Sequence, residues 1–131
     1  MENALRAGLI DWLRDDPSLA DINAIEEETP LRASPPWLGI SASASVDWGT
    51  KDRPGREIRV ALELETRTDD PAADAALLKL IERRALSLPP LTQNYEVASI
   101  RYLRSRSEQR ADNRRAALLE FRFRLFHPIT E

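Results

Sequence analysis

Residues 37–66 constrain the fold most, because they contain two stretches in which apolar and polar residues alternate. In residues 38–46 an apolar residue stands at every second position, with glycine or serine between. In residues 58–64 the apolar residues are separated by Arg59, Ala61 and Glu63. This period of two is typical of strands buried on one face. The segment therefore predicts an antiparallel hairpin with all of its apolar side chains on one face of a sheet.

The rest of the chain predicts two helices, two further strands and one ambiguous segment. Residues 3–14 form an amphipathic helix, because their large apolar residues recur at helical spacing. Asp70 and Pro71 are a good start for a second helix, whose buried stripe we expect to include Ala73, Ala76, Leu77, Leu80 and Ile81. Residues 95–106 and 116–126 alternate and predict strands, whereas residues 22–28 fit either a short edge strand or an irregular link.

This order of elements predicts an α+β fold in one domain that spans residues 1–131. We expect a two-layer sandwich, in which an antiparallel sheet of four or five strands carries both helices on its apolar face. The other face should be charged and rich in serine. A chain of this size buries enough surface to fold without a disulfide or a metal.

The residues that usually carry chemistry are scarce. The chain has no cysteine, its one histidine is His127 beside Pro128, and it has four glycines. These counts exclude histidine triads and sites built from several histidine or cysteine ligands, and no phosphate-binding loop is present. Residues 26–28 are three glutamates but lack the spacing of a calcium loop. We therefore expect no enzyme activity, no cofactor, no metal and no small-molecule substrate.

The amino-terminal segment is amphipathic rather than apolar, and the sequence has no run of 18 apolar residues. We expect a soluble chain with no cleaved leader and no membrane contact.

Charge is unevenly distributed along the chain, although the net charge is only −3. Residues 1–31 contain eight acidic residues and two arginines, whereas residues 101–124 contain eight arginines and three acidic residues. Three uses remain open: pairing within the fold, complementarity between copies, or contact with an anionic partner. Cross-strand ion pairs are the simplest use of most of these arginines.

Both hairpins have polar tips, residues 47–55 and 107–115, that exceed the usual two to five residues of a hairpin loop. Such long loops often have a function. Trp48 in the first tip either folds back over the sheet edge or anchors another chain, and its polar neighbours favour the second alternative. Trp37 lies on the serine side of its strand and is a second candidate contact.

The first tip also carries a family resemblance. The sequence Asp47-Trp48-Gly49-Thr50-Lys51, followed by Gly55-Arg56-Glu57, resembles a small phage tail-completion family, the tail terminators of siphophage-like particles and gene transfer agents. The similarity extends in outline over nearly the whole chain. It includes Leu-Arg-Ala in the first helix, the Pro30 region, the Pro-Pro entry to the strand, the aspartate-started second helix, and Asn113-Arg114-Arg115 before the last strand.

The resemblance implies a structural role in particle assembly, in which a hexameric ring caps the tail tube, ends its polymerisation and joins it to a head-connector or stopper protein. The ring would sit at the head-proximal end of the tail, in a particle assembled in the bacterial cytoplasm, and DNA would only pass through it. We expect the contacts with neighbouring copies and partner proteins at the two tips, through Trp48, Thr50, Lys51, Arg53, Arg56, Glu57, Arg110, Asn113, Arg114 and Arg115.

The residues alone leave an alternative open, a small nucleic-acid-binding or adaptor domain. In that case Arg122 and Arg124 would form a basic strip on the last strand, and Tyr102 is the nearest aromatic residue that could stack on a base.

Overall fold

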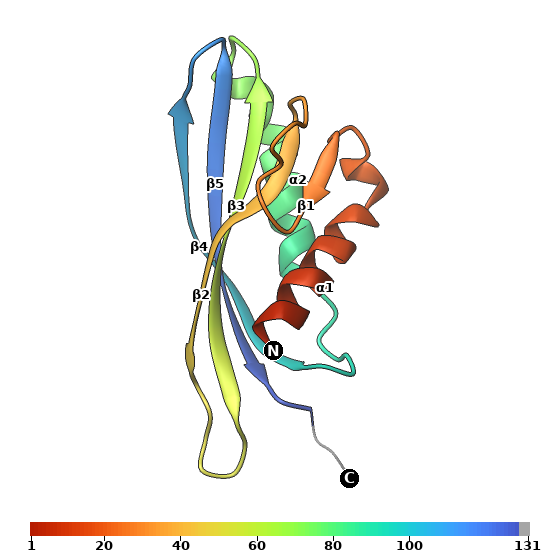
Figure 1. Ribbon diagram of the computed structural model, residues 1–131, viewed down its shortest axis with the longest axis vertical. Coiled ribbons are helices and arrows are strands. Elements are labelled where there is room, and N and C mark those ends of the chain that lie inside the picture. Colours follow the sequence, from red (N-terminus) through yellow and green to blue (C-terminus); the bar gives the residue numbers. More distant parts are fainter. Residues whose placement is uncertain (129–131) are drawn as a thin grey trace.

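Figure 1 shows two layers, a sheet and a pair of helices, in a computed structural model that describes residues 1–128. The elements are, in order, α1 (Glu2–Arg14), a 3-10 turn (Pro17–Leu19), β1 (Ala24–Glu26), β2 (Trp37–Asp47), β3 (Gly55–Arg67), a second 3-10 turn (Pro71–Asp74), α2 (Ala75–Leu86), β4 (Glu96–Gln109) and β5 (Arg114–Phe126). The predicted α+β sandwich is confirmed.

The sheet has five strands in the order β1-β2-β3-β5-β4. The pairs β2–β3, β3–β5 and β5–β4 are antiparallel, as predicted, but β1 runs parallel to β2. The sheet is therefore mixed, because residues 27–36 carry the chain back along the sheet before β2 begins. The ambiguous segment is thus a short edge strand, and the link after it contains a cis peptide bond between Pro35 and Pro36.

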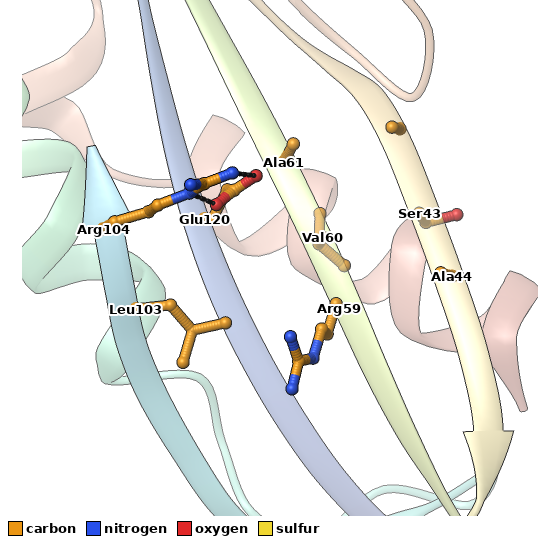
Figure 2. Close-up of a pocket in the computed structure, with 9 residues that line it drawn as sticks. Ser43, Ala44, Arg59, Val60, Ala61, Leu103, Arg104 and Glu120 are labelled. Carbon is orange, nitrogen blue, oxygen red and sulfur yellow. Dashed lines mark hydrogen bonds and ion pairs between the residues drawn. The ribbon is translucent and has the colours of Figure 1, made fainter. Parts of the chain in front are cut away.

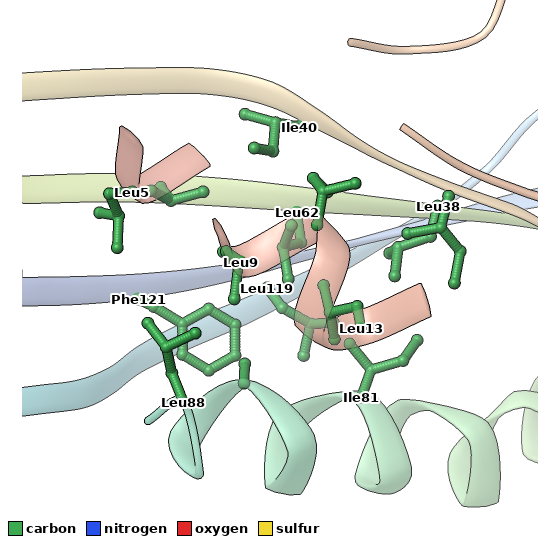
Figure 3. Packing of buried hydrophobic residues seen from close by; sticks show 14 of the residues in the cluster. Leu5, Leu9, Leu13, Leu38, Ile40, Leu62, Ile81, Leu88, Leu119 and Phe121 are labelled. Atoms are coloured by element: carbon green, nitrogen blue, oxygen red, sulfur yellow. The ribbon is translucent and has the colours of Figure 1, made fainter. Parts of the chain in front are cut away.

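Both helices pack on the same face of the sheet and share one core with it (Figure 3). Leu5, Leu9 and Leu13 of α1 are fully buried, which confirms the predicted stripe. The core also contains Leu62 of β3 and Phe121 of β5.

The second helix departs from its prediction at its start. Asp70 caps a turn by accepting a hydrogen bond from the Ala72 N–H, but this turn is a 3-10 turn and α2 begins only at Ala75. Ala73 and Ala76 are consequently exposed, and the fully buried contacts come from Ile81 and Ala85.

A bulge in β2 changes which residues face the helices. Ile40 pairs with Leu62 and Ala42 pairs with Ala61, so that Ser41 is an extra residue. Beyond it the alternation is reversed, and Ala42, Ala44 and Val46 lie on the face that the helices leave bare. The prediction that every apolar residue of this strand shares one face is therefore wrong. Ser43 faces α1 instead, where its hydroxyl donates a hydrogen bond to the Glu2 carboxylate at 3.0 Å.

A bulge in β4, at one edge of the sheet, likewise changes which residues lie on the bare face. Tyr102 pairs with Phe121 and Arg104 pairs with Glu120, so that Leu103 is the extra residue. Strict alternation along the strand predicts that Arg101 lies on the opposite side from Arg104 and Arg106. This is wrong, because the bulge brings all three arginines onto the bare face of the sheet.

The connection between β4 and β5 is shorter than predicted. Strand β4 continues to Gln109 and β5 begins at Arg114, which leaves only residues 110–113 for the turn. Asp112 and Asn113 adopt positive φ angles of 61° and 60° there. Asp and Asn are the residue types other than glycine that tolerate this conformation best, so the local sequence suits a tight turn.

Candidate interaction surface

The first tip, residues 48–54, is closed by its own backbone hydrogen bonds. The Trp48 N–H donates to the Gly55 carbonyl at 3.2 Å, and the Thr50 N–H donates to the Arg53 carbonyl at 2.7 Å. The Thr50 hydroxyl in turn accepts from the Arg53 N–H at 3.1 Å. Thr50, predicted as a contact residue, thus also shapes the loop.

Trp48 folds back on the sheet instead of extending from it. Its ring lies 5.0 Å from the Phe126 ring, and the guanidinium of Arg124 lies 5.4 Å from the Trp48 centroid. The expectation that Trp48 has no apolar neighbour is wrong, because the last residue of β5 lies beside the tip. Trp37 is also no exposed contact, since it is only 6% exposed.

Arg53 holds the tip against the end of the sheet. Its guanidinium stacks 4.5 Å from the Phe126 ring, pairs with the Glu96 carboxylate, and donates to the His127 carbonyl at 3.1 Å. The His127 N–H donates to the Pro54 carbonyl at 3.1 Å. His127 therefore fixes the loop through its backbone.

The exposed residues at this tip are mostly small or polar, and Pro54 is exposed as well. Gly49, Thr50, Lys51 and Asp52 are all exposed, and they form the lower end of the molecule in Figure 1. Arg56 is half-buried and pairs with Asp47 at 3.1 Å.

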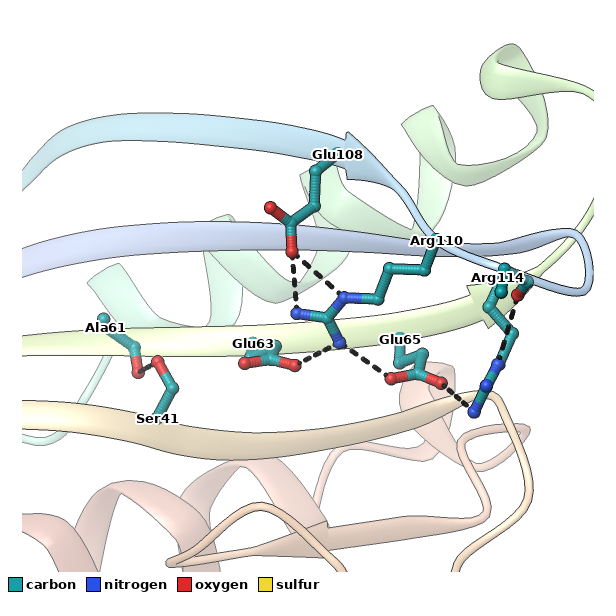
Figure 4. Close-up of polar contacts among 8 residues, drawn as sticks. Ser41, Ala61, Glu63, Glu65, Glu108, Arg110 and Arg114 are labelled. Atoms are coloured by element: carbon teal, nitrogen blue, oxygen red, sulfur yellow. Dashed lines mark hydrogen bonds and ion pairs between the residues drawn. The ribbon is translucent and has the colours of Figure 1, made fainter.

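A dense ion cluster lies near the second tip (Figure 4). One Arg110 nitrogen donates to the carboxylates of Glu63 and Glu65, both at 2.9 Å, and the other donates to Glu108 at 2.8 Å. Glu63 and Glu65 are only 8% and 5% exposed. Partial burial lowers the pKa of Arg110, but the hydrogen bonds to Glu63 and Glu108 outweigh it and leave that pKa above its ordinary value. We call these four residues the closed cluster.

The other residues predicted at the second tip also have partners within the chain. Arg114 lies 3.5 Å from Glu65, and the Arg115 side chain donates to the Thr68 carbonyl at 3.3 Å. The Asn113 carbonyl accepts from the Thr68 N–H at 2.9 Å, while its side chain remains exposed. The turn is thus joined to the end of β3.

The two arginines of the nucleic-acid alternative, Arg122 and Arg124, share one carboxylate, and their side chains are only 16% and 33% exposed. Arg124 donates to Glu57 at 3.0 Å, and Arg122 lies 3.9 Å from the same carboxylate. Tyr102 packs edge-on against Phe121 at 5.8 Å, on the side of the helices. Tyr102 therefore lies on the opposite face of the sheet from Arg122 and Arg124, and the three residues do not form one nucleic-acid-binding surface as this alternative requires.

A depression of about 550 Å³ lies on the bare face between β2 and β4 (Figure 2). Its floor is apolar and its sides carry charge. We call it the arginine groove, and the residues that define it are Ala42, Ala44, Arg59, Ala61, Leu103, Arg104 and Glu120. The sequence did not predict it, because the two bulges turn Ala42, Ala44 and Leu103 onto this face.

One carboxylate stands among three arginines at the groove. Arg104 pairs with Glu120, and this hydrogen bond lowers the pKa of Glu120, with the charges of Arg106 and Arg59 adding to the effect. Glu57 lies 3.9 Å from Arg59 but is shared with two further arginines. Positive charge therefore exceeds negative charge at this place.

Within the described residues 1–128, no three His, Cys, Asp or Glu side chains gather as metal ligands. None of the helices in that part of the chain is long and apolar enough to span a membrane.

The bare face of the sheet carries ion pairs and a groove, and a loop lies at each end of the sheet. The family model of tail completion protein gp17 matches residues 7–125, and the chain belongs to this family. The resemblance noted in the sequence is thus confirmed, and the protein has a structural role in tail assembly.

A solved structure shares this fold. A chain in the "Virion of native gene transfer agent (GTA) particle" superposes with a TM-score of 0.76 at 18% identity, over 93% of this chain and 94% of that one. No curated protein matches this sequence.

Proposed function

We propose that this chain forms a ring of six copies at the head-proximal end of the tail in a phage-like particle. The ring caps the finished tail tube, ends its polymerisation and joins it to the head connector. The observation that carries this proposal is membership of the tail-completion family over residues 7–125. The fold that the chain shares with a component of a gene transfer agent virion supports it.

The position of the two tips also supports a joining role. The β2–β3 tip and the β4–β5 turn lie at opposite ends of the long axis of the molecule (Figure 1). A subunit with this shape can contact one partner protein at each end. Thr50 and Lys51 at one end, and Asn113 at the other, are predicted contact residues whose side chains are exposed.

Electron microscopy of particles from a strain that lacks the gene tests this role. We expect unjoined heads together with tails of uncontrolled length, and we expect the wild-type gene supplied in trans to restore finished particles. Normal tails on normal heads in the deleted strain would refute the proposal.

A further inference from the structure

We propose that neighbouring copies join head to tail, with Glu27, Glu28 and Leu31 of one copy seated in the arginine groove of the next. This inference rests on the ring proposed above and names the surface through which its copies meet.

The arginines at the groove outnumber the carboxylates that they pair with, and their side chains are exposed. The side chains of Arg59 and Arg104 are 61% and 68% exposed, and Arg106 beside them is exposed as well. Within the described residues, Arg106 has no ion-pair partner closer than 4 Å. An exposed cationic patch adds little to folding, so an anionic partner can use it.

The floor of the groove suits an apolar side chain. Ala42, Ala44 and Ala61 have small side chains, and Leu103 closes one side with 37% of its surface exposed. The bulges beside Val97 and Leu103 also interrupt the regular edge of β4, which opposes simple strand addition. A partner is therefore expected to bind the groove through its side chains.

A second segment of the same chain, from the end of β1 onward, has matching chemistry. Glu26, Glu27 and Glu28 are exposed, and none of them pairs with a basic residue in the part of the chain that the structure describes. Leu31 follows them and is 99% exposed, with Arg32 next to it. This acidic segment with one protruding leucine is complementary to an apolar floor flanked by arginines.

The two surfaces are different parts of the same chain. The groove spans the bare face from β2 to β4, whereas Glu27 and Glu28 follow β1 and line a separate depression with Arg6 beyond the β2 side of the sheet. Strand β1 is one edge of the sheet, with α1 beside it, and β4 is the other, with α2 beside it. A contact between two different surfaces of the same chain, repeated from copy to copy, closes into a ring when the rotation allows it.

Charge reversal tests the contact. One variant carries Glu27→Arg and Glu28→Arg, and the other carries Arg59→Glu and Arg106→Glu, which leaves the Arg104–Glu120 pair in place. Each variant opposes like charges at every contact between its own copies, and like charges facing each other cost several kcal/mol. Supplied alone in the deleted strain, each should lower the number of finished particles by roughly a hundredfold.

Recombining the reversed surfaces provides the matched control. Co-expression of the two variants allows an alternating ring in which every contact again joins opposite charges, and the variant with all four substitutions is matched to itself. Both should restore finished particles to within about tenfold of wild type. Sedimentation should show weak self-association for each purified double variant alone, and restored association for their mixture and for the variant with all four substitutions.

Three results would overturn the inference while the proposed ring stands. One is wild-type particle numbers from either double variant. Another is failure of both recombined forms although circular dichroism and thermal unfolding show that the variants fold. The third result is that only the Arg59→Glu and Arg106→Glu variant gives few finished particles and that it also loses salt-dependent binding to duplex DNA. In that case the groove binds nucleic acid instead. Normal particles in the deleted strain would refute the proposed function itself.

Discussion

Two charge clusters on the bare face of the sheet are built in opposite ways. In the closed cluster, three carboxylates surround Arg110, and two of them are buried. At the arginine groove, Glu120 pairs with Arg104 and is also influenced by the charges of Arg106 and Arg59, and all three arginines are exposed. Buried carboxylates without a cation are costly, whereas exposed arginines cost little when unpaired. The closed cluster therefore serves the fold, and the groove is free to serve a contact.

The largest effect on stability is expected from Arg110→Ala. This substitution leaves Glu63 and Glu65 buried without their shared donor, and should lower the free energy of unfolding by about 2 kcal/mol. Arg106→Ala removes an exposed arginine beside the groove and should change stability by no more than about 0.5 kcal/mol. Urea unfolding of both variants measures the difference.

A second substitution checks the cause of the Arg110 effect. In the Arg110→Ala background, Glu63→Gln removes one unpaired charge and should recover part of the lost stability. Equal stability losses for Arg110→Ala and Arg106→Ala would contradict the distinction between the two clusters.

A smaller loss is expected from Trp48→Ala at the first tip. The ring contact with Phe126 and the partial burial of Trp48 together contribute about 1 to 2 kcal/mol. Lys51→Ala at the same tip should be neutral in thermal unfolding, because its side chain is exposed. Unchanged stability of Trp48→Ala together with lost particles would instead make Trp48 an anchor for another chain.

The two clusters should differ in how strongly added salt changes the property that each one supports. Between 0.1 and 1 M salt the screening length falls from about 10 to about 3 Å. Self-association through the exposed groove should weaken by about tenfold over this range, as followed by sedimentation at constant protein concentration. The stability of the fold should change much less, and association that strengthens with salt would indicate an apolar contact instead.

The smallest effect concerns acid pH and Glu120. The hydrogen bond to Arg104 lowers the pKa of Glu120 in the folded chain. The contribution of this carboxylate to stability is therefore present above the unfolded value of 4.5 and is lost as the pH falls through the folded pKa. Because the pair is exposed, this contribution is at most a few tenths of a kcal/mol. The free energies of unfolding of wild type and Glu120→Gln, measured in urea, should differ slightly at pH 7, and this difference should disappear as the pH falls through the folded pKa.

Local periodicity was enough to predict most of the fold. The helical spacing of Leu5, Leu9 and Leu13, and the alternation in residues 58–64, each depend on neighbours within a few positions. The tail-completion family was also visible in the sequence of the first tip. These features could be predicted because they do not depend on how distant segments of the chain pair.

The groove and the closed cluster depend on such pairing and were not predictable. Nothing in the sequence distinguishes Ser41 or Leu103 as an extra residue, yet each bulge reverses the side on which later residues lie. Arg110 meets Glu63 and Glu65 across more than 40 positions of the chain. The packing of Phe126 on Trp48 likewise joins two segments that only the sheet brings together.

Electron cryomicroscopy of finished particles tests the central claim most directly, because it shows what each cluster contacts in the assembled tail. We expect a closed ring in which density for residues 26–31 of one copy fills the arginine groove of its neighbour, while the closed cluster keeps its contacts within one chain. A ring in which the groove faces open solvent, or in which Arg110 pairs across the interface, would contradict this account.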